Sequence, residues 1–184
     1  MSERENSINN REVIIDVVKN ITPDVDVYVH REQLTITVPK DKILDVAKEL
    51  YSNDRTKFNL CVDVTGVDWN RKKDRFQVIY ILYSLEHNHR VRLKTTIQES
   101  DATIPSLTSV WESANWYERE TYDMYGIKFE GHPDMRRFYM PEDYEDPETG
   151  EPIYPLRKDF PLAGIPGSLP LPAYPEKYGD IQEN

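Results

Sequence analysis

The chain has 184 residues, of which 38% are hydrophobic and 30% are charged, so we expect one domain with a substantial core. The formal net charge of −10 excludes the basic surface that sequence-independent nucleic-acid binding requires. The single cysteine, Cys61, excludes an internal disulfide and an all-cysteine iron–sulfur or zinc site, and its apolar neighbours indicate a buried, inert thiol.

No run of apolar residues reaches the length of a membrane span, and the polar first residues differ from a signal peptide. We therefore expect any membrane contact to go through other subunits. Residues 1–10 are expected to be frayed, because they are polar and terminal.

The first third of the chain predicts a helix, a hairpin and a second helix. Apolar residues at helical spacing indicate a helix over residues 11–21. Alternating apolar residues over 25–29 and 34–38 indicate two half-buried strands joined as a hairpin. A second amphipathic helix is predicted over residues 41–51, with Asp41 as its N-cap.

A third strand is predicted over residues 58–67. Its alternation places Leu60, Val62 and Val64 on one face. Residues 68–74, which follow, are expected to form an exposed polar turn.

Two longer strands and a brief helix come next. Residues 75–83 and 89–97 alternate and are separated by a short link, which predicts an antiparallel pair. A brief helix is expected over residues 105–112, because proline and serine at its start favour a first turn.

A helix with two different faces is predicted over residues 115–126. Asn115 is the expected N-cap, and Glu118 is expected to reach back to it in a capping box. Gly126 is expected to end the helix in the left-handed conformation. The helix then has a packing face with Ala114, Tyr117, Thr121 and Met124, and a charged, aromatic face with Glu112, Trp116, Arg119 and Asp123.

The C-terminal part of the chain is rich in proline. Three of the 13 prolines precede residue 130 and the others follow it, which forbids regular helix and sheet-interior strand there. Large apolar side chains persist in this part, so we predict an arm that wraps a partner rather than a disordered linker. The predicted fold class is α+β, with a small, mostly antiparallel sheet and flanking helices in a globular domain over residues 1–130, followed by an extended Pro-rich arm over residues 131–184.

Three carboxylates in the predicted helix leave two interpretations open. Glu118, Glu120 and Asp123 could form an acid–base cluster, because neighbouring carboxylates can have pKa values that differ. Helix capping and ion pairing with Arg119 explain the same residues, and we favour that structural interpretation.

His132 and two pairs of basic residues also allow both a ligand-binding and a structural interpretation. His132 with a nearby carboxylate could bind a metal, but a lone histidine beside Pro133 lacks the spacing of a metal motif, so we favour a structural role. The pairs Arg136–Arg137 and Arg157–Lys158 could bind an anionic ligand, or clamp carboxylates of this chain or of a neighbour; we favour an interface.

Three stretches of the chain, Tyr117–Ile127, Glu130–Arg137 and Pro155–Leu162, resemble the signature of the C-type subunit of respiratory complex I. This is the 30 kDa subunit of the mitochondrial enzyme and the J-type subunit of the cyanobacterial and chloroplast enzyme. The resemblance covers residues 111–162. It departs from the family at residues 145–154, where the link between the motifs is longer and acidic.

The resemblance implies a non-redox structural or assembly subunit in the peripheral arm of a proton-translocating NADH:quinone oxidoreductase. It implies that FMN and iron–sulfur clusters lie on other subunits and that the complex acts on a quinone. The implied partners are the D-type subunit, which resembles a hydrogenase large subunit, and the B-type subunit, which holds the terminal iron–sulfur cluster. The implied location is the cytoplasmic face of the cell membrane, or the matrix or stroma side in an organelle.

The same scaffold role in a related complex is the alternative, namely a ferredoxin:plastoquinone oxidoreductase, a coenzyme F420-dependent dehydrogenase or a membrane-bound group 4 hydrogenase. The resemblance implies no catalytic, cofactor-binding or metal-binding residue in this chain. It implies fold-locking and interface roles for Glu118, Arg119, Glu120, Tyr122, Asp123, Gly126, His132, Pro133, Arg136, Arg137, Pro155, Leu156, Arg157, Lys158 and Asp159.

Overall fold

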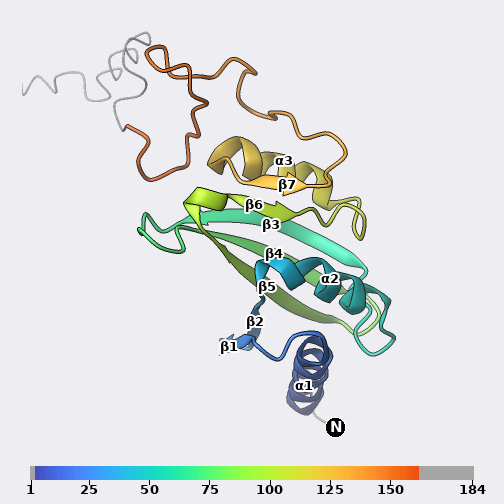
Figure 1. Ribbon diagram of the computed structural model, residues 1–184. Helices are drawn as coiled ribbons and strands as arrows, with labels where there is room; N and C mark the ends of the chain where they lie inside the picture. The colour runs from blue at the N-terminus through green and yellow to red at the C-terminus, as the bar shows by residue number, and fades with distance from the viewer. Residues whose placement is uncertain (1–2, 162–184) are drawn as a thin grey trace, which may run out of the picture.

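Five strands form a mixed sheet at the centre of the fold (Figure 1): β1 (Asp26–His30), β2 (Gln33–Thr37), β3 (Leu60–Asp68), β4 (Phe76–Ser84) and β5 (His89–Ile97). The computed structural model describes residues 3–161, with side chains from residue 10 onward. The strand order is β1-β2-β5-β4-β3, and every neighbouring pair is antiparallel except β2 and β5. The predicted α+β class with a mostly antiparallel sheet is confirmed.

Three α-helices accompany the sheet: α1 (Glu3–Ile21), α2 (Ile43–Ser52) and α3 (Ala114–Tyr125). The short elements are the 3-10 helices η1 (Lys40–Lys42) and η2 (Glu99–Asp101), and the parallel pair β6 (Thr103–Pro105) and β7 (Lys128–Glu130). Between residues 3 and 161, no helix is long and apolar enough to cross a membrane.

The core lies on one face of the sheet, against α1, α2 and the segment that leads into α3. β4 alternates strictly between buried and half-buried residues, and β5 does so from Val91 onward, as predicted, because one face packs and the other does not. The helix α2 buries its predicted apolar stripe against this face. The buried residues of these three elements are Phe76, Val78, Tyr80, Leu82, Ser84, Val91, Leu93, Thr95, Ile97, Ile43, Val46, Ala47 and Leu50.

Several element boundaries differ from the predictions. The helix α1 begins at Glu3, so residues 3–10 are helical rather than frayed. The N-cap of α2 is Lys42, without a side-chain bond, because Asp41 lies inside η1. The brief helix predicted over residues 105–112 is wrong, since β6 and a series of turns take its place.

The strand β1 is not half-buried as predicted. Val27 and Val29 are 37% and 45% exposed, because β1 is the last strand at its edge of the sheet and all five of its residues are exposed. Arg11 in α1 donates to the carbonyl of Glu32 at 3.0 Å and so joins this hairpin to the first helix.

The predicted face of β3 is wrong over its first half. A β-bulge between Cys61 and Asp63 shifts the alternation by one residue. Leu60 and Val62 are therefore exposed, while Cys61 and Val64 are buried.

The helix α3 covers the other edge of the sheet, alongside β3 (Figure 1). Ser113 Oγ donates to the carbonyl of Cys61 at 2.9 Å, and Thr121 Oγ1 donates to the carbonyl of Val64 at 3.1 Å. These hydroxyls bind carbonyl groups that have no partner strand, so this edge is closed to further strand pairing.

Candidate functional site

The signature residues gather where α3 meets the chain that follows β7. We call residues 131–161 the arm segment; Figure 1 shows it in orange, running past α3. It contains no helix or strand, only an isolated bridge between Glu145 and Pro152. Its contacts with α3 and with the sheet make up the candidate site.

The first signature carboxylate, Glu118, is buried under the start of α3. Its Oε2 accepts a hydrogen bond from Ser106 Oγ at 2.6 Å, and its Oε1 accepts one from Leu107 N at 2.8 Å. The predicted capping box is wrong, because the N-cap is Ser113 and Asn115 lies within the helix. Glu118 instead fixes the loop that precedes α3.

Burial changes the acidity of the groups around Glu118. It raises the pKa of Glu118 to about 7, although the hydrogen bonds from Ser106 and Leu107 favour the charged form. Burial and the nearby Glu118 also raise the pKa of the Cys61 thiol to about 12, which keeps that thiol protonated. The hydroxyl of Tyr80 is buried in the same region and has no hydrogen-bond partner among the described residues.

The second buried carboxylate, Asp123, binds the arm segment directly. Its Oδ1 accepts a hydrogen bond from Arg137 Nη1 at 2.9 Å. Its Oδ2 accepts the backbone N–H groups of Phe138, Tyr139 and Met140 at 3.1, 2.6 and 2.8 Å. Burial favours a higher pKa for Asp123, but these N–H groups and the Arg137 guanidinium outweigh it and hold the pKa below its ordinary value. Asp123 is thus a charged anchor for the arm segment.

Two arginines fix the arm segment, one from within it and one from α3. Arg137 also donates to the carbonyls of Tyr144 and Ile153 at 3.1 and 3.2 Å, so it gathers both ends of the longer acidic link. From α3, Arg119 donates to the carbonyls of Arg136 and Arg137 at 3.3 and 3.1 Å. On the charged face of α3, Arg119 and Asp123 are therefore covered by the arm segment, whereas Glu112 and Trp116 stay exposed.

The end of α3 fits closely against the last motif of the arm segment. Gly126 has a φ of +75°, which confirms the predicted left-handed C-cap. A Cβ at this position would come within 2.6 Å of the Tyr154 ring and of Arg157 Nη2. Arg157 Nε in turn donates to the carbonyl of Tyr125 at 2.7 Å. Only glycine satisfies both the backbone conformation and this close approach.

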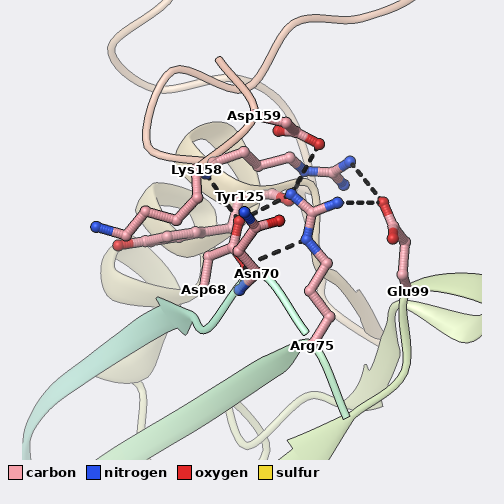
Figure 2. A network of polar contacts seen from close by, with 8 residues as sticks. Asp68, Asn70, Arg75, Glu99, Tyr125, Lys158 and Asp159 are labelled. Atoms are coloured by element: carbon pink, nitrogen blue, oxygen red, sulfur yellow. Dashed lines mark hydrogen bonds and ion pairs between the residues drawn. The ribbon is translucent and has the colours of Figure 1, made fainter. Parts of the chain in front are cut away.

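After the contacts at Asp123 and at Gly126, a third anchor joins the arm segment to the C-terminal end of β3 and the residue before β4 (Figure 2). Arg75, which directly precedes β4, is 5% exposed and donates to Asp68 from Nε at 3.1 Å and from Nη2 at 2.8 Å. Its Nη2 lies 2.8 Å from the carboxylate of Asp159, and its Nη1 lies 2.5 Å from that of Glu99. Lys158 N donates to Asp68 Oδ2 at 2.8 Å.

This third anchor stays charged over the ordinary pH range. Burial favours a higher pKa for Asp68, but Arg75 and the N–H groups of Lys158 and Asn70 lower it to about 2. The hydrogen bond to Asp68 raises the pKa of Arg75, and the contact with Asp159 acts in the same direction. The motif around Asp159 is thereby fixed to the central sheet.

Asp68 and Arg75 were not predicted as site residues, because the sequence places them at the ends of an expected exposed turn. An acid at the end of one strand and an arginine at the start of its antiparallel partner give a weak signal of such a pair. Nothing in the local sequence indicates that Asp159 and Lys158 complete the network, because their approach depends on the path of the arm segment.

Three signature residues lie at the start of the arm segment. His132 Nε2 donates to the carbonyl of Asn115 at 3.1 Å, and His132 Nδ1 accepts the N–H group of Asp134 at 3.0 Å. Both ring nitrogens are therefore occupied, and the histidine joins the arm segment to α3. Arg136 is exposed and pairs with Asp134 at 2.9 Å, and Pro133 is exposed.

The remaining signature residues are partly accessible. Tyr122 packs edge-on against Tyr154, with ring centroids 6.4 Å apart. Glu120 and Pro155 are half-buried. Leu156 is 51% exposed, although its N–H group bonds the C-terminal end of α3.

Three aromatic side chains remain exposed beside these contacts, and we call Trp116, Phe138 and Tyr139 the aromatic face. They are 55%, 39% and 58% exposed. Ring centroids lie 5.1 Å apart between Trp116 and Phe138, and 4.4 Å apart between Phe138 and Tyr139. The guanidinium of Arg119 lies 4.7 Å from the Trp116 ring centroid. A contiguous exposed aromatic group of this kind is typical of an interaction site.

The arrangement does not gather the three carboxylates of α3 into one acid–base centre. Glu118 binds the loop before α3, Asp123 binds the arm segment, and Glu120 is half-buried. Within the described part of the chain, no group of three or more His, Cys, Asp or Glu side chains is placed to hold a metal ion. The site is suited to holding the arm segment in one position.

The sequence matches a family model over residues 36–166, a range that contains all three signature motifs. That family is described as respiratory-chain NADH dehydrogenase, 30 Kd subunit. The chain belongs to this family. The resemblance of the signature motifs is thereby confirmed.

Curated members of the 30 kDa family align with most of the chain. The NADH-quinone oxidoreductase C subunit of Geobacter sulfurreducens is 41% identical over 157 residues, which are 85% of this chain and 91% of that protein. The corresponding C subunit of Nocardioides sp. is 37% identical over 158 residues, but this chain spans only 60% of that longer protein.

Two solved structures share the fold of this 30 kDa-family chain. A trypsin-resistant fragment of Nqo5, residues 1–134, is 29% identical with a TM-score of 0.59, over 68% of this chain and 98% of the fragment. A chain of the membrane-bound sulfane sulfur reductase, an archaeal respiratory membrane complex, is 32% identical with a TM-score of 0.65, over 82% of this chain and 85% of that one.

Proposed function

We propose that this chain is a structural, non-redox subunit in the peripheral arm of a proton-translocating NADH:quinone oxidoreductase. The family match over residues 36–166 carries the proposal. The site supports it, because the buried signature charges at Asp123 and Arg137 are bonded within the chain and hold the arm segment in place.

The geometry supports a bracing role. Three anchors, at Gly126, Asp123 and Asp68, fix the arm segment to the body before any partner binds. A segment that is already ordered loses less conformational entropy on docking, and this favours tight assembly. The aromatic face and the exposed Leu156 are then available to a partner.

The proposed partners are the D-type subunit, which resembles a hydrogenase large subunit and helps form the quinone site, and the B-type subunit, which holds the terminal iron–sulfur cluster. In this proposal FMN and the iron–sulfur clusters lie on other subunits, and the chain reaches the cytoplasmic face of the membrane only through them. The arm of residues 131–184 is proposed to wrap these partners; its residues 162–184 lie outside the described part of the chain.

Affinity purification tests the proposal. The tagged full chain is isolated from its own membranes in mild detergent, and co-purifying proteins are identified by mass spectrometry. We expect the B-type and D-type subunits together with an NADH-binding flavoprotein. The chain purified alone is expected to show neither flavin nor iron–sulfur absorbance and no NADH or quinone turnover. Bound flavin or iron in that preparation, or recovery of the chain without partners from membranes, would contradict the proposal.

A second candidate keeps the scaffold role but places it in a related complex. The fold shared with the archaeal membrane-bound sulfane sulfur reductase favours it, since that complex is not named for NADH or quinone. The same purification separates the two. An electron-input module linked to ferredoxin or coenzyme F420, or a nickel-containing partner, would support this second candidate.

The aromatic face supplies a mutational test of partner binding. Trp116→Ala is expected to lower the yield of co-purified subunits by about tenfold or more, because exposed aromatic anchors often contribute about 2 kcal/mol or more at interfaces. Trp69→Ala is the matched control, since Trp69 is 47% exposed and lies in the turn between β3 and β4. Equal yields from the two variants would remove the aromatic face from the interface.

A further inference from the structure

The sheet has a second face, opposite the core, that none of the described core residues covers. Its central strands β4 and β5 carry two parallel rows of side chains. Ile79, Ile81 and Tyr83 on β4 are half-buried and do not pack against the core. Arg90, Arg92 and Lys94 on β5 lie beside them, with Ile79 opposite Lys94, Ile81 opposite Arg92 and Tyr83 opposite Arg90. We call these six residues the open sheet face.

The three cations of the open sheet face have no carboxylate partner among the described residues. Arg92 donates to the side-chain oxygen of Gln33 at 3.2 Å, and the Arg90 guanidinium lies 5.4 Å from the Tyr83 ring centroid. No ion pair is formed by Lys94 within the described part of the chain. Residues two apart on a strand share one face, so these like charges stand in a row.

The carboxylates that the described strands place on this face are too distant to neutralise the row. Asp63 is opposite Ile81, which separates it from Arg92 by a whole strand. Asp26 is opposite Thr37, which separates it from Lys94 in the same way. Two strand spacings amount to about 9–10 Å. Interactions over that distance at an exposed surface are largely screened.

Exposure to water alone does not explain why apolar side chains of β4 lie beside cations of β5 on this face. A sheet face open to water usually carries polar side chains, as Gln33, Thr35 and Thr37 do on the neighbouring strand β2. The strand β4, on the other side of β5, instead carries the apolar side chains of Ile79 and Ile81 in the middle of the same face. The unpaired cations also belong to a chain with a formal net charge of −10. Apolar and cationic rows side by side complement a surface that is both acidic and apolar.

We propose that the open sheet face docks an acidic, amphipathic surface of another subunit. Carboxylates of that subunit pair with Arg90, Arg92 and Lys94, and its apolar side chains cover Ile79 and Ile81. This docking surface is separate from the aromatic face, which lies on α3 and the arm segment. The proposal rests on the proposed function, because it requires an assembled complex.

A zero-length carbodiimide cross-linker tests this contact in the purified complex. The reagent joins an amine to a carboxylate only when the two are in direct contact. We expect Lys94 to be joined to an Asp or Glu of a co-purified subunit. Lys94→Arg is the control, since it keeps the charge and the assembly but removes this cross-link. A Lys94 cross-link that forms only within this chain would overturn the proposal.

Charge reversal supplies an independent readout. Arg92→Glu with Lys94→Glu is expected to leave the melting temperature of the isolated chain nearly unchanged, because these side chains are half-exposed and form no ion pair among the described residues. It is expected to reduce the yield of the complex by about tenfold or more. The control, Lys72→Glu with Lys73→Glu, makes the same charge change on an exposed turn and is expected to assemble normally.

The remaining outcomes are distinguishable. Normal assembly of the charge-reversed variant would overturn this inference and leave the proposed function intact. Loss of binding to phosphatidylglycerol vesicles, with all subunits retained, would assign the face to a lipid surface and also overturn it. Recovery of the wild-type chain alone would contradict the proposed function itself.

Discussion

Two adjacent arginines of the arm segment have opposite environments. The side chain of Arg137 is 8% exposed and pairs with Asp123, which is fully buried. The side chain of Arg136 is 62% exposed and pairs with Asp134 at the surface. Removing one member of a buried pair leaves an uncompensated charge, whereas an exposed pair contributes little. The two positions therefore form a natural matched comparison.

Arg137→Ala is expected to lower the free energy of unfolding by about 3 kcal/mol, because Asp123 stays buried with only its backbone donors. Arg136→Ala is expected to lower it by about 0–1 kcal/mol. Urea unfolding of the isolated chain measures both. Equal effects would show that the arm segment does not depend on the Arg137–Asp123 pair.

Glu118 gives the stability of the protein a recognisable pH dependence. Burial raises its pKa from 4.5 to about 7, so the folded state holds this proton more tightly than the unfolded state. The contribution of Glu118 to stability therefore falls as the pH rises from about 4.5 to about 7, by up to about 1.4 kcal/mol per pH unit. Asp68 and Asp123 have lowered pKa values, so their contributions change at lower pH, below the ordinary Asp value of 3.8.

Glu118→Gln is expected to remove this fall, because glutamine stays neutral while keeping an oxygen for Leu107 N. Urea unfolding at several pH values between about 4.5 and about 7 compares the variant with the wild type. The same slope in both proteins would assign the pH dependence to another group.

At the scale of elements, the end of α3 is shaped by the motif that packs on it. Gly126 and Gly131 both have positive φ, +75° and +82°. A Cβ at Gly126 would meet Tyr154 and Arg157 at 2.6 Å, whereas a Cβ at Gly131 would meet nothing within 4 Å. Alanine at either position carries the strain of a left-handed conformation, about 1–2 kcal/mol.

Gly126→Ala is therefore expected to destabilise the protein more than Gly131→Ala does, since it also displaces the arm segment. Urea unfolding measures the difference. Hydrogen exchange at the N–H group of Leu156, which bonds the carbonyl of Met124, is expected to become faster only in Gly126→Ala. Similar exchange in both variants would mean that the contact with α3 survives the added methyl group.

At the scale of the whole molecule, the arm segment and the body share charged contacts across residue 130. We propose a division into a globular domain over residues 1–130 and an arm over residues 131–184. Asp123 and Asp68, both in the body, receive hydrogen bonds from the arm segment. The arm is thus proposed to be a partner-binding element that is also bonded to its own domain.

Truncations test this division. A chain that ends at residue 161 is expected to keep the stability of the full chain and to bind its partners less well. A chain that ends at residue 130 is expected to fold, but with a free energy of unfolding lower by more than the value of about 3 kcal/mol expected for Arg137→Ala, because all hydrogen bonds from the arm segment to Asp123 and Asp68 are lost. Urea unfolding and co-purification measure the two effects. Unfolding or aggregation of the chain that ends at 161 would place residues 162–184 in the core.

The sequence by itself determined the features that depend on local pattern. Strict alternation predicted β4 and β5, apolar spacing predicted α2, and Gly126 marked the end of α3. These succeed because a period of two or of 3.6 residues directly reports which side chains face a core. The three motifs also identified the family, which the match over residues 36–166 confirms.

Only the tertiary structure decided where the charged residues go. A bulge near Cys61 reversed the face of β3, and an edge position left β1 exposed, because neither depends on local periodicity. Glu118 was expected to cap α3, yet it binds the loop before the helix. Asp68 was expected in a surface turn and Arg75 at the start of the next strand, yet together they anchor Asp159. Such buried charges take partners from distant segments, and the path of the chain, rather than its local pattern, sets which partner comes within reach.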